Sequence, residues 1–137
     1  MDSFGVFSVS ASALAAQRQR MNVIASNMAN AHSTKTEEGG PYRRQDVVFS
    51  TDPMEGSQEG LTGVKVSTIV KDESPFKMVY DPGHPDADKD GFVATPNVNI
   101  IEEMVNMMMA SRAYEASVSA FNMSKAMFTK TLTLGNV

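Results

Sequence analysis

The sequence predicts a mainly helical chain with a small β insert, in which N- and C-terminal helices form a coiled-coil-like pair around short strands or hairpins. Residues 10–31 contain no proline or glycine and are rich in alanine, which favours helix. Residues 99–133 carry apolar side chains at a spacing close to 3.5, typical of a coiled-coil seam. Residues 32–96 contain short alternating runs between turn residues, which favours strands.

We expect the first helix at residues 3–31, about 35 Å long at 1.5 Å per residue. Arg18 interrupts its narrow apolar stripe. Asn27 and Asn30 lie three residues apart near its end, and asparagine competes with a helix for backbone hydrogen bonds. They indicate either a frayed helix end or a polar contact between helices. The stripe comprises Phe7, Ala11, Leu14, Met21, Ala25 and Met28.

The middle of the chain predicts three short strands, at residues 45–50, 63–71 and 76–80. Glycine and proline mark turns at 39–41 and 81–83. Two-stranded units of this size are marginally stable alone. We therefore expect the insert to pack against the helices or against neighbouring molecules.

The second helix is expected at residues 99–133, about 50 Å long. Asn99 is a suitable N-cap with Glu102 three residues later, and Gly135 can end the helix. Its predicted apolar stripe comprises Ile100, Met104, Met107, Tyr114, Val118, Phe121, Phe128 and Leu132.

The two stripes can meet in an antiparallel hairpin, but the second helix has apolar surface to spare, including Ile101, Val105 and Met108. Exposed apolar patches of this kind indicate an interaction surface. A self-contained monomeric hairpin is the alternative. We divide the chain into an N-terminal helical segment (1–34), a β-rich insert (35–97) and a C-terminal helical segment (98–137).

Composition excludes several classes of function. The net charge is −4 with no basic stripe, so nucleic-acid binding is not expected. Absence of cysteine excludes disulfides, zinc–thiolate sites and cysteine nucleophiles. No apolar run is long enough to span a bilayer, and the N-terminus lacks the pattern of a cleaved signal peptide. If the protein leaves the cytoplasm, we expect export without such a signal.

Residues 86–91 match the first half of a calcium-binding loop, with Asp86, Asp88 and Asp90 followed by Gly91. The second half fails, because Asn97 stands where a bidentate glutamate is required. An acidic turn with Gly91 in a left-handed conformation is the better interpretation. A calcium-responsive helical-hairpin binding module is the alternative function.

No catalytic constellation is present in the sequence. His32 and His84 are far apart and lack a metal-ligand spacing. Glu102 and Glu103 are adjacent, so they point to different sides of a helix and are interpreted as first-turn charges. We expect no enzyme activity, no metal and no cofactor.

Both ends of the chain resemble a known family. Residues 12–30, which include Asn27-Met28-Ala29-Asn30, resemble the N-terminal signature of flagellar axial proteins, and residues 103–116 and 130–135 resemble the C-terminal one. Residues 41–44, 81–88, 91–93 and 96–98 are similar to the short proximal-rod proteins. Ser117 departs from the asparagine of many relatives. The chain is identified as a member of the flagellar basal-body rod family.

This resemblance implies a structural subunit that polymerises through its terminal helices into a tubular drive shaft and export channel. It implies export by the flagellar type III apparatus, a location in the basal body spanning the periplasm, and terminal segments that become ordered on assembly. The implied partners are further copies of the chain, other proximal and distal rod proteins, the basal-body adaptor at the membrane ring and the export apparatus.

Two sets of residues are expected to make the contacts of assembly. Polar contacts between helices are expected from Asn27, Asn30 and Arg112. Subunit packing is expected from Leu14, Met21, Met28, Met104, Tyr114, Val118, Phe121 and Leu132.

Overall fold

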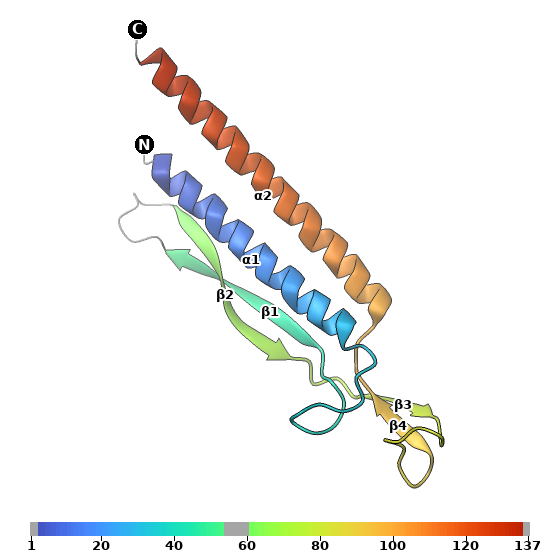
Figure 1. The fold of residues 1–137 in the computed structure, drawn as a ribbon. Coiled ribbons are helices and arrows are strands. Elements are labelled where there is room, and N and C mark those ends of the chain that lie inside the picture. The colour runs from blue at the N-terminus through green and yellow to red at the C-terminus, as the bar shows by residue number, and fades with distance from the viewer. Residues whose placement is uncertain (1–2, 54–60, 136–137) are drawn as a thin grey trace.

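The computed structural model describes residues 3–53 and 61–135. Two long helices enclose four short strands in chain order, which confirms the predicted fold class (Figure 1). The elements are α1 (Ser3–Ala29), β1 (Gln45–Pro53), β2 (Thr62–Lys71), β3 (Lys77–Tyr80), β4 (Phe92–Thr95) and α2 (Ile100–Leu134).

Helix α1 is the middle layer of the molecule. It lies antiparallel to α2 on one side and is covered by the β1–β2 hairpin on the other (Figure 1). Because α1 packs against two layers, its buried side chains do not follow one narrow stripe. Ala16, Val23 and Ile24 are buried, whereas Ala11 and Ala25 are exposed, so the predicted stripe is wrong at those two alanines.

Strands β1 and β2 form an antiparallel hairpin that pairs Gln45 with Lys71 and Pro53 with Thr62. The pairing register shifts between Val48 and Phe49, as at a β-bulge. Ser12 of α1 accepts a hydrogen bond from the Val64 amide over 3.1 Å, which links the helix directly to the hairpin.

A second hairpin, β3–β4, stands at the closed end of the helix pair (Figure 1). Strand β4 is not among the three strands that the sequence predicts, and its residues follow directly on the calcium-like acidic turn at 86–91. Gly91 has a φ of 84°, which confirms the left-handed turn. Asp88 Oδ1 accepts hydrogen bonds from the amides of Asp90 and Phe92, so this carboxylate stabilises the turn.

Gly91→Ala should destabilise the β3–β4 hairpin by about 1–2 kcal/mol, because an L side chain is disfavoured at this φ. A Cβ at residue 91 would also lie 2.9 Å from Tyr80 Cε2 and 3.2 Å from Pro82 Cβ. Gly83→Ala is the matched control, since its Cβ would meet only Asp81 Oδ1 at 3.6 Å. Amide hydrogen exchange at residues 77–80 and 92–95 measures the effect, and equal exchange in the two variants would contradict this account.

Helix α2 begins and ends near its predicted limits. Asn99 is the N-cap, and its side chain accepts a hydrogen bond from the Ile101 amide. Gly135 is the C-cap with a φ of −80°, so it ends the helix without adopting a left-handed conformation. Within residues 3–53 and 61–135, neither helix combines the length and hydropathy that a membrane span requires.

Candidate functional site

Helix α2 contacts α1 through a regular heptad series. Among its buried and half-buried side chains, one series recurs at alternating steps of four and three residues, as expected for a helix that packs along its whole length, and the half-buried Asn106, Ser111, Ala113 and Val118 flank it. Ile100, Met104 and Leu132 of the predicted stripe are exposed instead. The series, which we call the α2 seam, comprises Glu103, Met107, Ala110, Tyr114, Ser117, Phe121, Ser124 and Phe128.

Aromatic contacts fix the seam near the chain termini. The Phe7 ring of α1 lies edge-on to Phe121 at a centroid distance of 5.3 Å and to Phe128 at 6.1 Å. Leu132 does not continue the series, whose next position after Phe128 is 131. It also lies in the last turn of α2, which runs past the start of α1 (Figure 1), and it is exposed.

Phe7→Ala should lower the free energy of unfolding by about 2–3 kcal/mol. The substitution removes two edge-to-face ring contacts and leaves a gap between the helices. Val6→Ala is the control, because Val6 is an exposed neighbour on the same turn. Urea unfolding followed by circular dichroism measures both, and an equal midpoint for the two variants would refute the role of the ring.

The opposite end of the seam is polar. Asn27 of α1 is 0% exposed, and its side-chain amide makes four hydrogen bonds. Nδ2 donates to Gln45 O over 2.8 Å and to Glu103 Oε2 over 2.9 Å, while Oδ1 accepts from Gln45 N and Tyr42 Oη. This one side chain therefore connects α1, α2 and the beginning of β1.

Glu103 is the second buried member of this network, at 1% exposure. Its Oε1 accepts a hydrogen bond from Arg44 Nε over 2.8 Å. Burial alone would lower the pKa of Arg44, but the hydrogen bond and charge of Glu103, with a contribution from Asp46, outweigh it and raise the pKa. The guanidinium thus stays charged and compensates the buried carboxylate. We call Asn27, Tyr42, Arg44, Gln45 and Glu103 the Asn27–Glu103 network.

A second layer of contacts supports Arg44. Its backbone amide donates to Asn97 Oδ1 over 2.8 Å, and Asn97 Nδ2 donates to the carbonyls of Asp72 and Ser74. Hydrogen bonds from Ser74 lower the pKa of Asp72, whose Oδ2 lies 3.6 Å from Arg44 Nη1. The network thus joins both helices to the segments before β1 and after β2.

Sequence reasoning missed Glu103 and Arg44 as members of this site. Glu103 was interpreted as a first-turn charge like Glu102, yet Glu102 is exposed and Glu103 is buried. The signal was the heptad phase, because Glu103 lies seven residues before Ala110, which is 0% exposed. Nothing local in the sequence identifies Arg44 as its partner.

The side of α2 that faces away from α1 is apolar and uncovered. Its large side chains are each at least half exposed and recur at helical spacing in two groups, at residues 101–109 and 123–134. Arg112, Ala116 and Ala120 lie among them and are also exposed. This outer face of α2 comprises Ile101, Met104, Val105, Met108, Met109, Met123, Met127 and Leu134.

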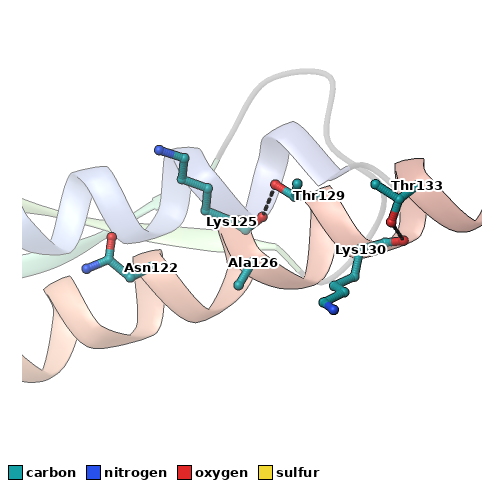
Figure 2. A pocket seen from close by; sticks show the side chains of 6 residues that line it. All are labelled: Asn122, Lys125, Ala126, Thr129, Lys130 and Thr133. Carbon is teal, nitrogen blue, oxygen red and sulfur yellow. Dashed lines mark hydrogen bonds between the residues drawn. The ribbon is translucent and has the colours of Figure 1, made fainter.

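A shallow hollow near the end of α2 is lined by that helix alone (Figure 2). Thr129 Oγ1 donates to Lys125 O and Thr133 Oγ1 donates to Lys130 O, so both hydroxyls are bonded to the helix backbone. Asn122 and Ala126 complete the lining. Its hydroxyls therefore contribute to the helix, and no acid–base pair stands among these six side chains.

The residues predicted for assembly occupy different environments. Leu14, Met21, Met28, Tyr114, Val118 and Phe121 are half-buried, whereas Met104 and Leu132 are more than half exposed. Asn30 Nδ2 donates to Ser26 O and its Oδ1 accepts from Ser33 Oγ, so its hydrogen bonds are local to the end of α1. Contacts of these residues and of Arg112 with a neighbouring subunit stay a prediction.

The acidic turn supplies no metal site by geometry. Among residues 3–53 and 61–135, no three histidine, aspartate or glutamate side chains lie where they could together bind a metal ion. Asp86 accepts a hydrogen bond from Thr34 Oγ1 over 2.8 Å, which ties this turn to the segment after α1. The carboxylates of Asp86 and Asp88 therefore accept hydrogen bonds beyond and within the turn.

Comparison with known proteins assigns the chain to a family. The protein-family model described as "Flagella basal body rod protein" matches residues 7–35, and the family model described as "Flagellar basal body rod FlgEFG protein C-terminal" matches residues 89–134. The chain is 48% identical over 135 residues to the flagellar basal-body rod protein FlgC of Salmonella typhimurium, covering 98% of this chain and 99% of the relative. The chain belongs to the FlgC family of flagellar basal-body rod proteins.

More distant members of the FlgC family match over the same extent. The Bacillus subtilis protein is 43% identical over 149 residues, covering 98% of this chain and 99% of the relative. The Borreliella burgdorferi protein is also 43% identical over 149 residues, with 98% of each chain covered. The predicted family is thus confirmed, and the chain is a structural component of the basal-body rod. The two matched segments contain most of α1 and all of α2.

Proposed function

We propose that the chain is a proximal-rod subunit that assembles through the outer face of α2, which packs against helices of neighbouring rod subunits. The observation that carries this proposal is the apolar character of that face, whose large side chains are each at least half exposed. Apolar surface of this extent on a single chain is typical of an interaction site. Membership of a rod family makes another rod subunit the partner.

A helical partner suits this surface because its large apolar residues form two groups at helical spacing, at residues 101–109 and 123–134, on either side of Arg112, Ala116 and Ala120. The α2 seam is occupied by α1 of the same chain, so a neighbour's seam is not free to receive the outer face, and in this proposal the outer face packs on a different surface of the neighbouring subunit. A contact between unlike surfaces generates a ring when its rotation closes and an open helical assembly when it does not. This arrangement supports a tubular rod that transmits rotation and contains the export channel.

In this proposal the role is structural and not enzymatic. The subunit is exported by the flagellar type III apparatus without a cleaved signal, and it lies in the part of the rod that spans the periplasm. Its neighbours are other proximal and distal rod proteins and the basal-body adaptor at the membrane ring. Its terminal helices gain their full order when the outer face is covered, as for other segments that fold on binding.

Site-specific crosslinking tests the proposed interface, and the absence of native cysteine makes the chain suitable for it. Met108→Cys carries a benzophenone reagent on the outer face, and Ser117→Cys carries it on the seam. In isolated basal bodies, residue 108 should crosslink to another rod subunit, whereas residue 117 should crosslink within its own chain. Failure of residue 108 to reach a second subunit in assembled rods would refute the interface.

A further inference from the structure

Five of the eight large apolar residues on the outer face of α2 are methionines. Their exposure ranges from 51% to 66%, so their thioether groups are open to small reagents in the isolated chain. Met21, Met28 and Met107 are half-buried, so they are less exposed than the methionines of the outer face. The five, which we call the outer-face methionines, are Met104, Met108, Met109, Met123 and Met127.

We propose that the outer-face methionines form an oxidation-sensitive site, at which peroxide converts the unassembled subunit into a form that cannot enter the rod. This inference rests on the proposed function, because it requires that the outer face be buried on assembly. Each methionine sulfur attacks one oxygen of a peroxide, the O–O bond breaks and an S–O bond forms. For hydrogen peroxide the second oxygen leaves as water, so sulfur loses two electrons and peroxide gains them.

The product has the opposite solvation preference from the starting side chain. A sulfoxide carries a strong hydrogen-bond acceptor, whereas a thioether packs as a flexible apolar group. A polar group buried in an interface without a partner is strongly unfavourable. Because five such groups lie along one helix face, even partial oxidation places an unpaired acceptor in the contact. Leucine offers similar apolar surface without this chemistry, so the sensitivity belongs to the methionines.

Assembly itself should end the sensitive period. In the unassembled chain all five side chains are more than half exposed. Once a neighbouring helix covers the outer face, peroxide no longer reaches them. The site therefore discriminates between subunits damaged before assembly and subunits already in the rod. Methionine sulfoxide is reversible by dedicated reductases, so a rejected subunit can regain competence.

The chain contains its own control for this proposal. Met78 on β3 is 56% exposed, similar to the outer-face methionines, but it lies on the second hairpin at the closed end of the helix pair. It should be oxidised as readily as they are. Because Met78 does not lie on α2, a chain that carries sulfoxide at this residue alone should enter rods freely.

The test uses cells whose only copy of the chain is induced shortly before a hydrogen peroxide pulse, which is then quenched so that assembly proceeds. Peptide mass spectrometry measures sulfoxide at each methionine in rods and in the unassembled pool. We expect outer-face sulfoxides to be depleted at least threefold in rods relative to the pool, with Met78 sulfoxide equal in both. Equal outer-face sulfoxide in rods and pool would overturn the proposal.

A variant with leucine at all five outer-face positions provides a second arm, and Met108→Leu with Met109→Leu provides a milder one. Peroxide should reduce rod formation of the native chain at least threefold more than that of the leucine variants. Equal loss would place the sensitive group elsewhere and overturn the proposal.

A Met108→Asp variant separates this proposal from the proposed interface. If Met108→Asp assembles normally, the outer face is not the interface. If Met108→Asp is excluded while sulfoxide-bearing chains assemble, the oxidation site alone is refuted.

Discussion

Cells that carry Val105→Asp together with Met108→Asp as their only copy of this chain should fail to swim and should lack complete rods. Both positions lie on the outer face of α2 and are at least half exposed. In the isolated subunit the new carboxylates stay in water, so the free energy of unfolding should change by less than about 1 kcal/mol. In the rod they would be transferred into an apolar contact without partners, which is prohibitive.

Met78→Asp together with Val79→Asp is the matched control for this double variant. Both are exposed apolar residues of β3, which is a different element from the outer face of α2. Two carboxylates there should leave swimming normal. Motility in soft agar and electron microscopy of isolated basal bodies provide the measurements. Normal swimming by the Val105→Asp, Met108→Asp variant would remove the main support for the proposed interface.

Tyr114→Asp and Phe121→Asp should also abolish motility, but by a different route. Both residues belong to the α2 seam, and Phe121 packs on Phe7 of the same chain. A buried charge there should separate α1 from α2, so the purified variants should lose stability as well as function. Urea unfolding distinguishes them from the outer-face variants, whose stability should be retained. Normal swimming in either variant would count against the seam.

Glu103→Ala should lower the free energy of unfolding by about 2–4 kcal/mol, because removing one partner of a buried ion pair leaves the other uncompensated. Glu103 accepts from Arg44 Nε and from Asn27 Nδ2, so both donors lose an acceptor at once. We expect a loss in the lower half of that range, because the Arg44 side chain is 20% exposed and can be solvated by water when Glu103 is removed.

Glu102→Ala separates this effect from a loss of first-turn charge. Glu102 and Glu103 are adjacent in the first turn of α2, but Glu102 is exposed whereas Glu103 is buried. Its replacement should change stability by less than about 0.5 kcal/mol. Urea unfolding of both purified variants, followed by far-ultraviolet circular dichroism, gives the comparison. Identical midpoints would show that the buried carboxylate contributes nothing beyond its position near the helix dipole.

The helices were accessible from the sequence because their signals are local. Residues 10–31 contain no breaker, and Asn99 caps the second helix at the predicted position. Strand β4 was not accessible, because its residues follow a glycine turn that matches half of a calcium loop. Pairing of Tyr80 with Phe92 depends on tertiary geometry that a single sequence does not encode locally.

The same distinction applies to the site. Surplus apolar residues such as Ile101, Val105 and Met108 were predicted from spacing alone, and all three lie on the outer face. The Asn27–Glu103 network was only half visible: Asn27 was singled out, but the ion pair joins residues 59 positions apart. The predicted stripe agrees with the seam at Met107, Tyr114, Phe121 and Phe128. It is wrong at Met104, which is exposed, because the sequence does not show which side of α2 packs against α1.

The four hydrogen bonds of Asn27 also have a mechanical consequence. Apolar side chains can slide past one another with little change in contact, but hydrogen bonds tolerate only a few tenths of an ångström. Slippage of α1 along α2 by one residue, about 1.5 Å, would break the bond to Glu103 and strain those to Gln45 and Tyr42. In a rod under torque, the helix pair should therefore resist shear most strongly at its closed end and yield first at the Phe7 end.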